Sequence, residues 1–133
     1  MKKQLLLFPL LALALVLAGC QPPENTTRDG IALLHGYITA AEGQHPECSP
    51  VNHPENQAQT QCQVIARAIG AQNAAIDALE VYCSGPAFDA GAGPCQPPKK
   101  GTPAYQTAAV KLQAAVAGMN QTQGDIKQLL GVK

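Results

Sequence analysis

Residues 102–131 read TPAYQTAAVKLQAAVAGMNQTQGDIKQLLG and contain the clearest helix signals in the sequence. A threonine followed by a proline is typical of a helix start, because the hydroxyl caps free N–H groups and proline fits the first helical position. A glycine such as Gly131 is typical of a helix end. Between these signals the apolar residues recur every three or four positions, which predicts one long amphipathic helix. Its apolar stripe consists of Tyr105, Ala109, Leu112, Val116, Met119, Ile126 and Leu130.

Two earlier segments repeat this spacing. Residues 27–42 carry Ile31, Leu34, Ile38 and Ala41 on one stripe, and residues 57–83 carry Cys62, Ile65, Ile69, Ile76, Leu79 and Cys83. No stretch alternates in the manner of a strand. Stripes with a 3-4 spacing pack helices at shallow crossing angles. We therefore expect an all-α domain over residues 27–133, a small three-helix up-down-up bundle.

The first predicted helix is much shorter than the other two. In an up-down-up bundle it therefore covers only part of the seam between the second and third helices. Two outcomes remain open for the uncovered half: either the loop at 84–101 folds back over it with Phe88 as a plug, or it stays exposed as an interaction surface. The residues concerned are Ile76, Leu79, Tyr82, Tyr105 and Leu112.

The N-terminus has the organisation of a secretory signal. Lys2 and Lys3 precede an almost wholly apolar run over residues 5–18. This run is long enough for the core of a signal peptide and shorter than the ~20 residues needed to cross a bilayer. We expect residues 1–19 to be a signal peptide that is removed from the mature chain.

Residues 17–20 read LAGC, which resembles the lipobox of bacterial lipoprotein precursors. The resemblance implies that Cys20 becomes the first mature residue and carries acyl chains such as palmitate, with residues 20–26 as a lipidated tether. More than one acyl chain gives stable membrane anchoring. Gln21 replaces the Asp that retains many such proteins in the inner membrane, so the resemblance implies the outer membrane of a Gram-negative bacterium. It identifies a targeting class and no functional family.

Four cysteines remain in the mature chain, and an exported chain is oxidised, so we expect two disulfides. Cys62 and Cys83 fall near opposite ends of one predicted helix, roughly 30 Å apart, whereas bridged Cα atoms lie within ~7 Å. This distance excludes a Cys62–Cys83 bridge and with it Cys48–Cys95. The crossed pairing, Cys48–Cys83 with Cys62–Cys95, would pull each loop along the length of the same helix. The expected bridges are Cys48–Cys62 and Cys83–Cys95.

The composition argues against several function classes. The mature chain keeps seven basic and nine acidic residues and few aromatic ones, which is the wrong surface for nucleic acid. Neither serine lies in a nucleophile motif, and no pair of carboxylates is placed for acid–base work, so we expect no enzyme and no cofactor. His45 and His53 are the only weak candidates for metal ligands, because the nearby cysteines are expected to be oxidised.

These features predict a lipid-anchored helical protein of the cell envelope. We expect it to act without catalysis, through contact with an envelope protein or with a second copy of itself. The alternative is a module that binds a small ligand or metal through the His45/His53 loop or an inter-helix cavity. Pull-down from cross-linked cells and native mass spectrometry separate the two hypotheses.

Overall fold

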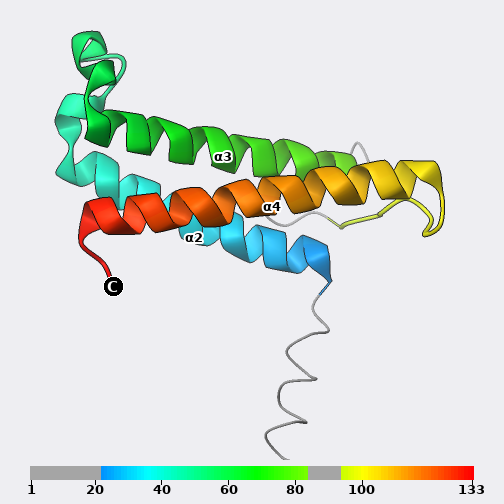
Figure 1. Ribbon diagram of the computed structural model, residues 1–133. Coiled ribbons are helices and arrows are strands. Elements are labelled where there is room, and N and C mark those ends of the chain that lie inside the picture. The colour runs from blue at the N-terminus through cyan, green and yellow to red at the C-terminus, as the bar shows by residue number, and fades with distance from the viewer. Residues whose placement is uncertain (1–21, 84–93) are drawn as a thin grey trace, which may run out of the picture.

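The computed structural model describes residues 22–83 and 94–133, and these form a three-helix up-down-up bundle (Figure 1). The expected all-α fold is confirmed. The elements are α2 (Pro23–Gln44), the short 3-10 helices η1 (Pro46–Cys48) and η2 (Pro54–Ala58), α3 (Thr60–Cys83) and α4 (Pro103–Leu130). In the described part of the chain, none of these helices combines the length and apolarity needed to span a bilayer. The expected signal peptide, Cys20 and Phe88 lie outside the described residues.

The first helix starts earlier than the sequence predicted. α2 begins at Pro23, so the expected tether over residues 20–26 is too long by four residues. Pro23 fits the first helical position, where its missing N–H group costs nothing. The carbonyl of Pro22 accepts hydrogen bonds from the N–H groups of Asn25 (3.0 Å) and Thr26 (3.3 Å), which closes the first turn. The added turn extends α2 over the seam that we expected to lack a third helix.

The other helix ends agree more closely with the sequence. Thr102 caps α4, with its hydroxyl oxygen accepting a hydrogen bond from the Tyr105 N–H at 3.2 Å. Gly131 ends α4 in a left-handed conformation, with a φ of 68°. α3 begins at Thr60 and not at Gln57, because Gln59 is extended and separates α3 from η2.

The core consists of two clusters of buried side chains. The larger one is centred on Leu34, Ile65 and Ile126 and spans all three helices. The smaller one lies at the far end of α3 and the start of α4, around Leu79 and Leu112. The half-buried Ile31 of α2 packs against both clusters, so the two are joined along the bundle.

Both expected disulfides are present. Cys48–Cys62 fastens the loop after α2 to the first turns of α3, with the Cα atoms 4.9 Å apart. Cys83–Cys95 joins the end of α3 to the segment before α4, with a Cα–Cα distance of 4.4 Å. Closing loops of this length stabilises a folded domain by roughly 3 kcal/mol per bridge. Such bridges compensate for the small size of the core.

Candidate binding groove

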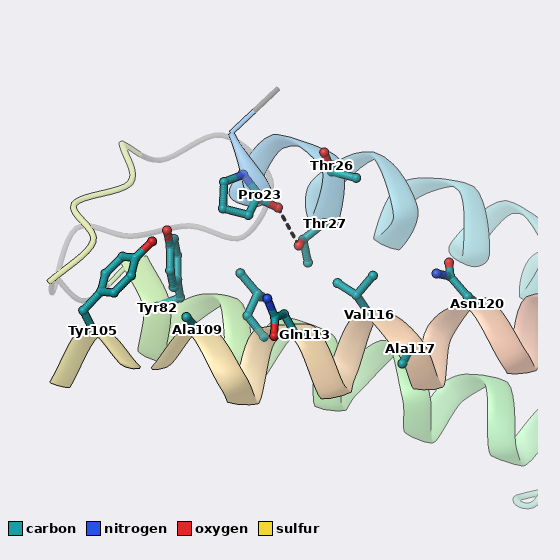
Figure 2. Close-up of a pocket in the computed structure, with 11 residues that line it drawn as sticks. Pro23, Thr26, Thr27, Tyr82, Tyr105, Ala109, Gln113, Val116, Ala117 and Asn120 are labelled. Atoms are coloured by element: carbon teal, nitrogen blue, oxygen red, sulfur yellow. Dashed lines mark hydrogen bonds between the residues drawn. The ribbon is translucent and has the colours of Figure 1, made fainter. Parts of the chain in front are cut away.

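A groove opens between the first turns of α2 and the N-terminal half of α4 (Figure 2). Its volume is about 420 Å³, which falls in the range of small-molecule and peptide side-chain sites. α2 supplies one wall, α4 supplies the floor and the other wall, and Tyr82 of α3 closes one end. The lining residues are Pro23, Thr26, Thr27, Tyr82, Tyr105, Ala109, Leu112, Gln113, Val116, Ala117 and Asn120.

The lining carries no formal charge, because none of these residues is an Asp, Glu, Lys or Arg. Ala109, Leu112 and Val116 give the groove an apolar floor. The exposed polar side chains of Gln113 and Asn120 stand at its rim. An apolar floor with a polar rim favours an uncharged, apolar group in the groove.

Two tyrosines define the closed end of the groove. The rings of Tyr82 and Tyr105 lie with centroids 6.0 Å apart and planes tilted by 54° (Figure 2). Tyr82 is only 3% exposed, and this burial raises the pKa of its phenol to about 12. Burial is the main cause, and the pKa of about 12 includes smaller contributions in the same direction from Tyr105 beside it and from the negative charge of Glu24. The Tyr82 phenol is therefore neutral at ordinary pH.

Thr27 is the most deeply buried polar residue of the α2 wall. Its side chain is 1% exposed, and its hydroxyl donates a hydrogen bond to the carbonyl of Pro23 at 2.7 Å (Figure 2). This bond satisfies the buried donor within α2. Thr27 therefore shapes the wall and leaves the tyrosine phenols as the polar groups at the closed end.

An exposed surface was one of the two outcomes left open for the seam, and the burial of its residues argues against it. Leu79 is fully buried, and Tyr82 and Leu112 are each 3% exposed, so these three residues belong to the core. Ile76 and Tyr105 are half-buried. The longer α2 is the physical reason, since it brings a third helix to this part of α3 and α4, where Ile31 packs against the smaller cluster. The other outcome, coverage by the loop at 84–101, lies largely outside the described residues.

Sequence reasoning missed the α2 wall of the groove. Pro23, Thr26 and Thr27 were assigned to the tether or to the very start of the helix. The available signal was the position of the prolines, because a proline is over-represented at the first helical position. Reading Pro23 as such a start would have extended the helix and placed its threonines beside Tyr82.

The two histidine candidates lie in a pair of similar turns. In each, a His-Pro-Glu sequence opens a 3-10 helix, and the histidine pairs with the glutamate two residues later. The distances from Nδ1 to Oε1 are 2.9 Å for His45–Glu47 and 3.2 Å for His53–Glu55. The duplicated tripeptide is a sequence signal that our reading of the motifs passed over.

These pairs change the acidity of both glutamates. The hydrogen bond with His45 is the main cause that lowers the pKa of Glu47. For Glu55 its own backbone N–H lowers the pKa most, and His53 contributes less.

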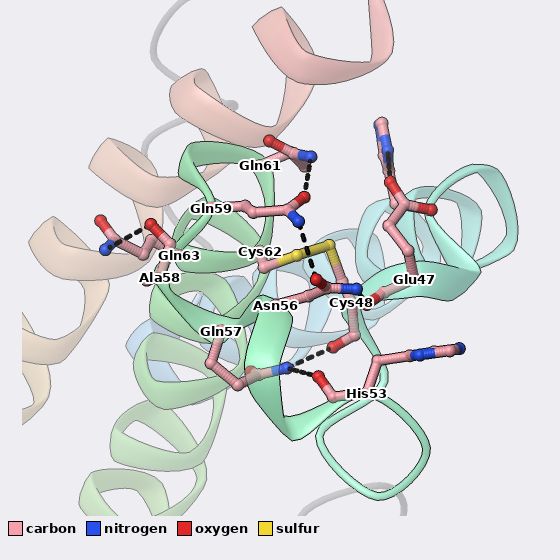
Figure 3. The surroundings of a disulfide bond; sticks show 11 residues. Glu47, Cys48, His53, Asn56, Gln57, Ala58, Gln59, Gln61, Cys62 and Gln63 are labelled. Atoms are coloured by element: carbon pink, nitrogen blue, oxygen red, sulfur yellow. Dashed lines mark hydrogen bonds and ion pairs between the residues drawn. A yellow bond between two sulfur atoms is a disulfide. The ribbon is translucent and has the colours of Figure 1, made fainter.

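Amide side chains fasten the two turns beside the Cys48–Cys62 bridge (Figure 3). Asn56 donates to the carbonyl of Glu47 at 3.1 Å, and Gln57 donates to the carbonyl of Cys48 at 3.1 Å. Each histidine thus has a partner within its own turn. Among the described residues, no group of three or more His, Cys, Asp or Glu side chains is placed to hold a metal ion.

No family model matches the sequence, and neither a curated protein nor a solved structure shows significant similarity to it.

Proposed function

We propose that this protein is a lipid-anchored, non-enzymatic protein of the bacterial cell envelope that acts through contact with a partner protein. Cys20 carries the anchor, by the resemblance of residues 17–20 to a lipobox, and holds the protein at the outer membrane. The partner contributes apolar side chains that enter the groove between α2 and α4. The observation that carries this proposal is the uncharged, apolar lining of that groove.

The position of the groove supports a role close to the membrane. Pro23 lies at the groove and follows Cys20 by three residues. Even a fully extended chain spans at most ~3.5 Å per residue, so the tether is about 10 Å long. The groove is thereby held near the membrane surface, where it meets other envelope proteins.

The chemistry of the groove favours binding over catalysis. General acid–base catalysis needs a group whose pKa lies near the working pH. The titratable side chains that line the groove are two tyrosines, and burial holds the Tyr82 phenol neutral with a pKa of about 12. A neutral phenol in an apolar pocket serves as a hydrogen-bond partner for a backbone or side-chain group of the ligand.

Site-specific photo-crosslinking in intact cells tests the proposal. A photoreactive residue replaces Ala117, which lines the groove and is exposed, and a control replaces Gln121, which is exposed on α4 outside the groove. We expect a discrete protein adduct from position 117 and none from 121. The substitution Ala109→Trp fills the groove floor and should abolish that adduct while the helical circular dichroism persists.

Other results of the crosslinking experiment would contradict the proposal. A lipid or small-molecule adduct at position 117 would contradict a protein partner and would favour the alternative function, a module that binds a small ligand. An adduct that survives Ala109→Trp, or equal adducts at both positions, would contradict a role for the groove.

A further inference from the structure

The side of the α3–α4 pair away from α2 is a second surface of the bundle, which we name the back face (Figure 1). Two shallow grooves follow it, and both are lined by residues of α3 and α4 alone. The first lies at the N-terminal end of α3 and includes Arg67 and Asp125. The second lies toward the C-terminal end of α3 and includes Asp77 and Lys111.

Small side chains on the back face allow another pair of helices to pack closely against it. The second groove is lined by four alanines, Ala74, Ala78, Ala114 and Ala115. Alanines let a facing helix approach closely, because their side chains form low ridges. Val81 adds an exposed apolar side chain at the edge of this groove, with 48% of its surface accessible.

The charges on the back face follow a pattern. Each groove contains one basic residue and one acidic residue, on opposite helices: Arg67 of α3 with Asp125 of α4, and Asp77 of α3 with Lys111 of α4. None of these four residues takes part in the His–Glu ion pairs that the structure shows among its described residues, and Arg67 donates only its Nε N–H group, to the carbonyl of Gln63 at 3.3 Å. All four are therefore available to a molecule that docks on this face.

This pattern is complementary to itself under a two-fold rotation. An axis parallel to the helices places α3 of one copy over α4 of the other at the same level. Arg67 then meets the partner's Asp125, and Asp77 meets the partner's Lys111. Each base faces an acid, as an isologous interface requires. Only a second copy is certain to carry the matching charges at matching heights.

We propose that the back face is the interface of a two-fold homodimer. α3 is 24 residues long, so the face measures about 36 Å by the width of two helices, ~20 Å. This gives roughly 700 Å² per copy, close to the ~800 Å² per partner of a standard stable interface. An axis parallel to the helices also leaves both α2 N-termini at one end. That last argument rests on the proposed lipid anchor, which then attaches both copies to the same membrane.

Charge reversal in the full chain, extracted in detergent and studied by sedimentation equilibrium, tests this dimer. We expect the wild-type chain to be dimeric. Arg67→Asp and Asp125→Arg each place like charges opposite one another, twice per dimer, and should weaken the dimer at least about tenfold. The double variant R67D/D125R restores opposite charges and should restore the dissociation constant. Glu42→Arg on the exposed side of α2 is the control and should change nothing.

The result that would overturn the proposal is a monomeric wild-type chain, or a double variant that associates no better than the single ones. Circular dichroism checks that each variant keeps its helices, so that misfolding is not mistaken for dissociation. Ala109→Trp, which fills the groove on the opposite side, should leave the dimer intact. Failure of the groove proposal and failure of the dimer are therefore separate observations.

Discussion

At the scale of single residues, Gly30 and Gly36 lie in the same helix, and both lower its helix propensity. They differ in whether a neighbouring helix lies close to them. A Cβ atom at Gly30 would lie 3.1 Å from Cε of Met119 on α4, whereas a Cβ at Gly36 would meet no atom within 4 Å. Glycine inside a helix costs up to ~1 kcal/mol relative to alanine. At Gly30 the close approach of α2 to α4 offsets this cost. At Gly36 no such contact offsets it.

Alanine substitution of the two glycines should therefore have different effects. We expect Gly36→Ala to raise the free energy of unfolding by about 0.5–1 kcal/mol. Gly30→Ala should gain less, because the Met119 methyl group must move by a few tenths of an ångström. Urea unfolding followed by circular dichroism measures both variants. A larger gain at Gly30 than at Gly36 would show that the α2–α4 contact is looser than described.

At the scale of the elements, α4 was predictable at both ends because its signals are local. The N-cap hydroxyl of Thr102 and the left-handed Gly131 act on backbone groups within a few residues of themselves. The start of α2 was missed because Pro22 and Pro23 fit two interpretations, an extended tether or a first helical turn. Packing of Thr27 against the bundle decides between them, and that packing involves residues far along the chain.

The cap of α4 can be tested by itself. Thr102→Ala removes the acceptor for the Tyr105 N–H and should lower the free energy of unfolding by about 1 kcal/mol. Thr102→Ser keeps a hydroxyl at the same place and should be close to wild type. Urea unfolding provides the comparison. Equal losses in both variants would mean that the threonine methyl group, and not the cap, stabilises this end of α4.

At the scale of the whole molecule, the Tyr82 phenol makes the stability of the bundle depend on alkaline pH. Its pKa is raised from 10.0 to about 12 in the folded protein, so the folded state holds this proton more tightly than the unfolded state. Below pH 10 both states are protonated, so this contribution to the free energy of unfolding is fully present. Between pH 10 and about 12 the unfolded state loses the proton first, and the stabilisation is lost.

We therefore expect the free energy of unfolding to fall by up to roughly 2–3 kcal/mol across this interval, because the folded state keeps the phenol proton that the unfolded state has lost. Tyr82→Phe has no phenol to ionise and should lose less stability over the same range. Tyr37→Phe, which removes a phenol outside the groove, is the matched control. Denaturant unfolding at a series of pH values gives the result, and equal slopes for the Tyr82→Phe variant and the wild type would refute the assignment.

Sequence patterns alone were enough to predict the helical fold, the ends of α4 and the pairing of Cys48 with Cys62 and of Cys83 with Cys95. These features follow from helical periodicity, caps and the length of a single helix, which are local properties of the chain. The folded bundle alone fixed where α2 meets α3 and α4. It buried Leu79 and Leu112, and it left the groove beside Tyr82 and Tyr105. The physical reason is that burial depends on which helices meet at a given level, and a shift of one turn in α2 changes which seam is covered.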